Sequence, residues 1–176
     1  DIYEAKKRFF EKTYSSKIIK LCQTKYASTN VVERYAFLQI ILSLIDKPCT
    51  VIDLGASIGL GLMSLNADTF SNIEIANDEI RYLIKKKASI LRTIGLDIQK
   101  PDLKWQLACY LPEIKKDRIK VEKIYFKLKQ KRSQIKFVQG DILKLNQMHL
   151  PKVDVIWTSN ELYQIEGNVK NLIKQI

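Results

Sequence analysis

The stretch Thr50–Met63, TVIDLGASIGLGLM, contains the pattern that decides the fold of this chain. Its first part is β-branched and apolar, as in a buried parallel strand, and ends at Leu54. Gly55 and Gly59 let the backbone turn sharply and come close to a ligand. Leu60 then begins an apolar helical pattern, and the N–H groups at the start of such a helix can meet that ligand. A strand, a glycine turn and a helix in this order are typical of a nucleotide-cofactor loop.

The composition indicates one compact, strongly basic domain. The chain has 176 residues, of which 46% are hydrophobic, and this is enough for a sizeable core. Its formal net charge is +11 and its pI is about 9.5, which favours anionic partners such as nucleic acid or an anionic membrane surface. The longest apolar stretches are too short to span a bilayer, and the sequence shows no signal peptide, so we expect no membrane insertion.

The cysteines and the single histidine do not form a recognisable site. Cys22, Cys49 and Cys109 are odd in number, widely scattered and without C-x-x-C spacing, which argues against a disulfide framework and a zinc site. His149 has no partner at ligand spacing. We therefore expect no metal, buried thiols and a cytoplasmic location.

Helical and strand-like patterns alternate along the chain. We expect helices over residues 1–47, 59–65 and 113–132, and another that Asp78 caps. We expect strands at 51–54, 72–76, 93–98, 135–138 and 153–158. This alternation implies parallel strands with right-handed crossovers, and hence an α/β doubly wound, mainly parallel Rossmann-like sheet.

The domain boundary is expected at the start of the first strand. Residues 1–48 would form a helical cap or packing segment, with a buried face made of Tyr35, Leu38, Ile41, Leu42 and Ile45. Residues 49–176 would form the Rossmann-like domain. The chain starts without methionine and ends soon after the fourth main strand, so we expect a sheet that is incomplete at its C-terminus, with an exposed edge unless other residues or a partner cover it.

The expected helix over residues 113–132 is amphipathic and basic. Its apolar face would comprise Ile114, Val121, Ile124, Tyr125 and Leu128. Its outer face carries lysines at positions 115, 116, 120, 123, 127 and 131. This row is either an ordinary solvated face or a stripe that follows the phosphates of a nucleic acid.

In a doubly wound sheet, ligands bind beyond the carboxyl ends of the strands. Four short motifs lie at these expected ends: D-x-G-x-x-x-G at residues 53–59, G-L-D at 95–97, V-x-G-D at 138–141 and V-D-V-I at 153–156. In this order they resemble class I S-adenosylmethionine-dependent methyltransferases, over roughly the C-terminal two thirds of the chain.

A narrower similarity is to an uncharacterised bacterial and archaeal branch of that superfamily. The branch has a G-A-S-A-G-L loop, an R-x-G-x-D-x-x-P segment and a W-x-x-A-x-x-x-P stretch that ends in arginine. This chain has GASIGL at residues 55–60, RTIGLDIQKP at 92–101 and WQLACYLP at 105–112, with Arg118 beyond them.

The resemblance implies an S-adenosylmethionine site at the first strand and its glycine turn. Gly55 and Gly59 would hold the turn beneath the cofactor. Asp53 would lie near the cationic methionyl amino group and sulfonium, or else would cap the following turn. Ser57 stands where the family has a middle glycine, and its side chain would either crowd the cofactor or donate a hydrogen bond to it.

The resemblance also implies roles at the later strand ends. Asp97 would accept hydrogen bonds from the ribose hydroxyls, although the usual spacing in the superfamily selects Asn77 or Asp78 instead. Asp141 would accept one from the adenine amino group, or else would cap the next helix. Asn160 would lie at the substrate, in a TSNELY segment that differs from the N-P-P-Y loop of amine-methylating enzymes.

Three functions follow as alternatives. The first is a methyltransferase whose substrate is RNA or another anion, and the second is a non-catalytic Rossmann-like module that binds nucleic acid or protein. The third, an NAD-dependent enzyme, is disfavoured because Ser57 and Leu60 replace the second and third glycines of G-x-G-x-x-G.

Overall fold

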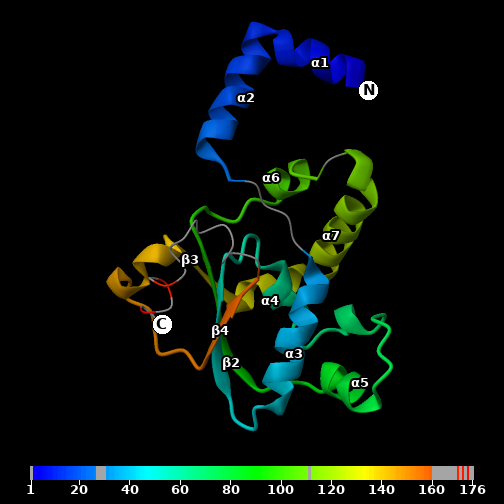
Figure 1. The fold of residues 1–176 in the computed structure, drawn as a ribbon, viewed down its shortest axis with the longest axis vertical. Helices are drawn as coiled ribbons and strands as arrows, with labels where there is room; N and C mark the ends of the chain where they lie inside the picture. Colours follow the sequence, from blue (N-terminus) through cyan, green and yellow to red (C-terminus); the bar gives the residue numbers. More distant parts are fainter. Residues whose placement is uncertain are drawn as a thin grey trace.

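The centre of the molecule is a four-stranded parallel sheet (Figure 1). The computed structural model describes residues 2–26, 31–110 and 112–159, together with residues 170, 172 and 174. The strands are β1 (Cys49–Leu54), β2 (Ile90–Asp97), β3 (Ile135–Gln139) and β4 (Val155–Thr158). Their order is β3-β2-β1-β4, and all three neighbouring pairs are parallel. The expected α/β parallel sheet is confirmed, and its order is that of the first four strands of a classic doubly wound fold.

Both faces of β1 are covered, so all of its residues are buried. Val51 faces a large apolar core together with side chains of α3 (Tyr35–Leu44), α4 (Leu60–Ser64) and α7 (Lys115–Leu128). Ile52 and Leu54 belong to a second cluster, against which residues from the 3-10 helix η5 (Ile142–Gln147) pack. The sheet is therefore covered by helices on one face and mainly by the segment between β3 and β4 on the other.

The prediction of a strand at residues 72–76 is wrong. Residues 71–76 form turns and irregular backbone between the 3-10 helix η2 (Asp68–Phe70) and α5 (Asp78–Lys85). Ile73 and Ile75 alternate because both pack against the large core. β2 pairs directly with β1, so this segment has no place between them.

The helix starts and buried faces differ from expectation in detail. Asn77, not Asp78, caps α5, because the Asn77 side chain accepts a hydrogen bond of 3.0 Å from the Ile80 N–H. Ile41 and Ile114, expected in buried faces, are exposed. Cys22 is exposed as well, although Cys49 is buried.

The N-terminal helices divide into two groups. α3 packs against the sheet and against α5. By contrast, α1 (Ile2–Phe10) and α2 (Lys12–Thr24) stand away from the sheet, and α2 has no buried residue (Figure 1). Within the described part of residues 1–48, α3 and the 3-10 helix η1 (Val32–Arg34), whose Val32 is buried in the large core, therefore pack on the rest of the molecule.

The basic segment is not one continuous α-helix. It comprises the 3-10 helix η3 (Pro112–Ile114), then α7, then the 3-10 helix η4 (Lys129–Gln134). It follows the short helix α6 (Leu103–Ala108), which packs against α7. Among the described residues, no helix is both long enough and apolar enough to cross a membrane.

Candidate functional site

The glycine turn after β1 is a tight loop held against β2. Gly55, Ser57 and Gly59 all have left-handed backbone conformations, with φ values of 83°, 53° and 76°. Glycine adopts this conformation without a steric penalty, whereas serine does so only at a cost. The N–H groups of Gly55 and Ala56 both donate to the carbonyl oxygen of Leu96, at 2.8 and 3.0 Å. The loop therefore lies at the carboxyl end of β2 as well as that of β1.

Asp97, the last residue of β2, is hydrogen-bonded to this loop. The Ser57 N–H donates to Oδ2 of Asp97 at 2.7 Å, and the Gln99 N–H donates to Oδ1 at 3.0 Å. Burial raises the pKa of Asp97 above its ordinary value, although N–H donors including those of Gln99 and Ser57 act in the opposite direction. Asp78 is instead exposed on α5, which packs beside α3. The structure thus brings Asp97, and not Asp78, to the glycine loop.

Gln106 is a buried polar residue of the site that the sequence analysis did not select. Its side chain is fully buried, and its Oε1 accepts a hydrogen bond of 3.0 Å from the Ser57 hydroxyl. Within the described part of the chain, its Nε2 has no hydrogen-bond partner, and neither does the buried Oε1 of Gln99. An unpartnered donor and an unpartnered acceptor near Ser57 leave hydrogen-bonding capacity that a water or a polar ligand can use.

Asp53 lies inside the protein. It is fully buried at the end of β1, and the hydroxyl of Tyr35 on α3 donates to its Oδ2 at 2.7 Å. Gly61 makes room for this contact, because a Cβ at that position would lie 2.0 Å from the Tyr35 ring. The Asp53 carboxylate therefore takes part in the packing of α3 on the sheet.

Asp141 adopts the capping arrangement. Its side chain accepts a hydrogen bond of 2.9 Å from the Leu143 N–H and so caps η5. The neighbouring Gly140 N–H donates to the backbone carbonyl of Asp97 at 2.9 Å, so the ends of β2 and β3 adjoin. Asn160, expected at the substrate, lies outside the described residues.

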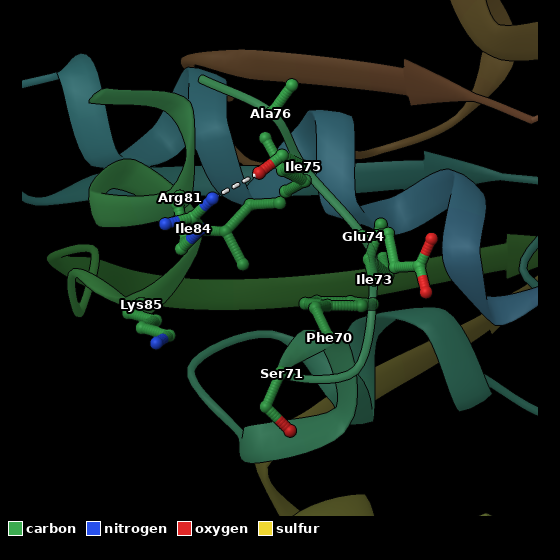
Figure 2. A pocket seen from close by; sticks show the side chains of 9 residues that line it. All are labelled: Phe70, Ser71, Ile73, Glu74, Ile75, Ala76, Arg81, Ile84 and Lys85. Carbon is green, nitrogen blue, oxygen red and sulfur yellow. Dashed lines mark hydrogen bonds between the residues drawn. The ribbon is translucent and has the colours of Figure 1, made fainter. Parts of the chain in front are cut away.

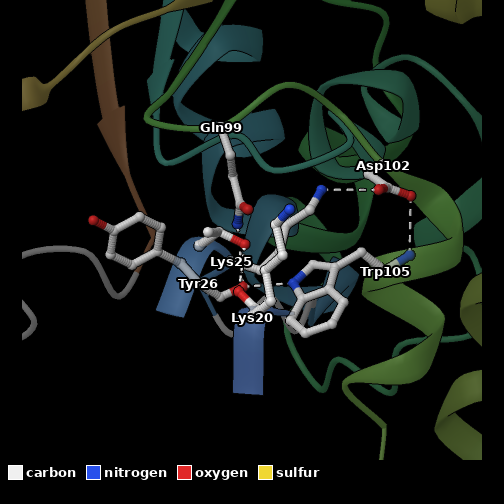
Figure 3. Close-up of polar contacts among 7 residues, drawn as sticks. Lys20, Lys25, Tyr26, Gln99, Asp102 and Trp105 are labelled. Atoms are coloured by element: carbon white, nitrogen blue, oxygen red, sulfur yellow. Dashed lines mark hydrogen bonds and ion pairs between the residues drawn. The ribbon is translucent and has the colours of Figure 1, made fainter. Parts of the chain in front are cut away.

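The end of α2 is attached to the segment that follows β2, as Figure 3 shows. We call residues 25 and 26 the strap. The Tyr26 carbonyl accepts hydrogen bonds from Trp105 Nε1 at 2.7 Å and from Gln99 Nε2 at 3.2 Å. Lys25 pairs with Asp102 at 3.0 Å. The Trp105 N–H and then Lys25 lower the pKa of Asp102.

The space beside Ser57 is small in this arrangement. The cavity that Ser57 lines with Gln99, Asp102 and Trp105 has a volume of about 10 Å³. This is room for about one water molecule. A nucleoside would fit in this cavity only if the strap or neighbouring residues moved.

The lysines of α7 form an exposed row. Lys115, Lys116, Lys123 and Lys127 are exposed, and Lys120 is exposed but paired with Glu33. Lys131 in η4 is half-buried. The expected basic face therefore exists over the length of the helix.

The chain was compared with protein-family models and with curated proteins. No protein-family model matches the chain, and no curated protein matches it. Within the described residues, His, Cys, Asp and Glu side chains form no group of three or more that could hold a metal ion. Functional evidence therefore comes from the chemistry of the strand ends.

Proposed function

We propose that the carboxyl ends of β1 and β2 bind S-adenosylmethionine and that the protein is a methyltransferase. One observation carries this proposal. The glycine loop is hydrogen-bonded to Asp97, and it lies close to the unpartnered amide atoms of Gln99 and Gln106. These groups offer a carboxylate acceptor, an amide acceptor and an amide donor within one small region. Such a set suits the hydroxyls and polar groups of a nucleoside.

The topology supports the same location. The chain leaves β1 to form its neighbour β2, and it later passes from β3 at one edge to β4 beside β1. The direction of winding therefore changes between β1 and β4, and ligands in such sheets bind outside the carboxyl ends at that point. Leu54 and Thr158, the last residues of these two strands, are paired in register.

Each residue has a stated role in this proposal. Asp97 would accept hydrogen bonds from the ribose hydroxyls, using lone pairs that its two N–H donors leave available. Gln106 would donate through Nε2 to a ligand oxygen. Asp53 is buried, so its part would be to hold α3 and β1 together beneath the site.

S-adenosylmethionine supplies an electrophilic methyl group on a cationic sulfonium. The protein would accelerate the transfer mainly by holding this group in line with a nucleophile. An RNA or another anionic substrate fits the net charge of +11. A cytoplasmic location belongs to the same proposal.

Isothermal titration calorimetry with S-adenosylmethionine and S-adenosylhomocysteine tests the proposal. We expect saturable binding that Asp97→Asn weakens about 10- to 150-fold, because loss of a charged acceptor costs about 1.5–3 kcal/mol. Asp68→Asn, which makes the same chemical change at an exposed residue of η2, should bind as the wild type does. Circular dichroism would show that both variants are folded. Absence of heat with the folded wild type at millimolar ligand would refute the proposal.

A second function is a non-catalytic module that binds nucleic acid. The exposed lysine row of α7 is the observation that favours it. In that case RNA affinity would fall steeply with salt while neither adenosyl ligand bound.

A further inference from the structure

A cavity of about 580 Å³ lies between residues 70–76 and α5, and its lining includes both Glu74 and Arg81 (Figure 2). Another cavity lies at the opposite end of β2 from the candidate cofactor site. Its volume is about 470 Å³, and it is lined by the first residues of β2, the end of α4 and part of η4. Three cationic side chains line it, namely Lys87, Arg92 and Lys131, and its described lining includes no carboxylate. The cavity is therefore a concave site of one charge sign.

The positive charges in this cavity face one another without compensation. The half-buried Lys131 ammonium donates to the Leu65 carbonyl, and burial followed by the charge of Lys87 lowers its pKa. Lys87 and Arg92 are exposed, and neither forms an ion pair with any described residue. Like charges brought together in this way repel, and a bound anion would offset the repulsion.

The cavity is continuous in sequence with the basic helix. Lys131 belongs to η4, which directly follows α7. α7 begins after α6, on the side of the strand carboxyl ends, and leads to the start of β3 at the other end of the sheet (Figure 1). Its 14 residues correspond to a length of about 21 Å. The exposed lysines of α7 thus extend from the cavity toward the candidate cofactor site.

We propose that this cavity binds a backbone phosphate of single-stranded RNA and anchors the strand whose distal part follows α7. Arg92 and Lys87 would contact the phosphate from the rim, and Lys131 from the wall. The described lining of the cavity contains no aromatic side chain on which a base could stack, so recognition would be of the backbone. The role of this RNA as the methyl acceptor rests on the proposed function, but the binding itself does not.

Fluorescence anisotropy with a short labelled oligouridylate tests whether this cavity binds RNA. We expect the double variant Lys87→Gln/Arg92→Gln to bind about tenfold more weakly than the wild type. The slope of log affinity against log salt should also become shallower by about 0.7, because the cavity holds one phosphate and each phosphate contact on a single strand contributes about 0.7. Both residues are exposed, so the variant should fold normally.

The matched control is Lys144→Gln/Lys152→Gln, which removes the same charge from exposed positions in and after η5. It should change RNA affinity less than about twofold, because these residues do not line the cavity. Equal losses in the two double variants would show only general charge attraction and would overturn the proposal. An undetectable affinity of the wild type for the oligouridylate would also overturn it.

A competition experiment distinguishes a cavity that binds RNA from one that binds only a free anion. Tripolyphosphate should displace RNA from the wild type only weakly, because it engages the cavity but not α7. If Lys87→Gln/Arg92→Gln lost tripolyphosphate binding and kept wild-type RNA affinity, the RNA proposal would be overturned. Titration of the same variant with S-adenosylhomocysteine should give the wild-type heat, so failure of the cofactor site and failure of the anchor are distinguishable.

Discussion

Asp97 joins three parts of the site through one carboxylate. It ends β2, accepts the Ser57 N–H of the glycine loop and accepts the Gln99 N–H of the segment that leads to α6. Burial disfavours its charged form, and its pKa is raised above the ordinary 3.8. A buried acceptor placed in this way suits a ligand that donates hydrogen bonds to it.

The raised pKa of Asp97 gives a pH dependence of stability. The folded protein holds this proton more tightly than the unfolded chain, so the contribution is fully present below the unfolded pKa and is lost as the pH rises through the folded pKa. Between these two values, the free energy of unfolding of the wild type should fall relative to that of Asp97→Asn, which does not titrate. Urea unfolding at a series of pH values from about 3.5 upward measures this difference. Parallel curves for the two proteins would contradict the expectation.

The contact between Tyr35 and Asp53 should matter for stability. Tyr35→Phe removes the hydroxyl that donates to the buried carboxylate, and we expect a loss of about 1–3 kcal/mol in the free energy of unfolding. Tyr82→Phe, at a residue that is 64% exposed, should change it by less than about 0.5 kcal/mol. Chemical denaturation measures both variants, and equal stabilities would show that the hydroxyl is not needed.

At the scale of elements, we expect the strap to limit access to the space beside Ser57. Its hydrogen bonds come from Gln99 and Trp105, which both line the cavity of about 10 Å³. If a nucleoside binds there, its entry would therefore compete with attachment of the strap.

Trp105→Phe tests this competition, because it keeps an aromatic ring but removes the indole N–H that donates to Tyr26. A lost hydrogen bond of about 1 kcal/mol should accelerate trypsin cleavage after Lys25 several-fold. Phe126→Leu, at an exposed aromatic residue of α7, should leave the rate unchanged. Saturating S-adenosylhomocysteine should accelerate the same cleavage in the wild type. Protection of Lys25 by the ligand would contradict the account.

Most strands were predictable because each is rich in apolar or β-branched residues and has glycine, proline or aspartate at or next to one end. β1, β2, β3 and β4 all overlap the expected ranges. The prediction of a strand at 72–76 failed because Ile73 and Ile75, which pack on the core, show the alternating apolar pattern that is also typical of a strand. Periodicity alone does not say whether a neighbouring strand is available for pairing.

At the scale of the whole molecule, the candidate site was predictable in part. Asp97 and the glycine loop were expected together because the carboxyl ends of parallel strands share one edge of a sheet. The contact of Ser57 with Gln106 and that of the strap with Trp105 join residues far apart in sequence. Such contacts depend on how the helices pack against the sheet, and local sequence patterns do not determine that packing. A glutamine on the buried face of short α6 was the one available signal for Gln106.

The most direct test is to map S-adenosylhomocysteine on the protein by ¹H–¹⁵N correlation spectroscopy. The largest shifts should fall on the backbone N–H groups of Gly55, Ser57, Gln99 and Gly140, which surround the ends of β1, β2 and β3. Arg92 and Lys131, at the other cavity, should not shift. A spectrum unchanged at saturating ligand, or shifts confined to residues away from these strand ends, would contradict the central claim.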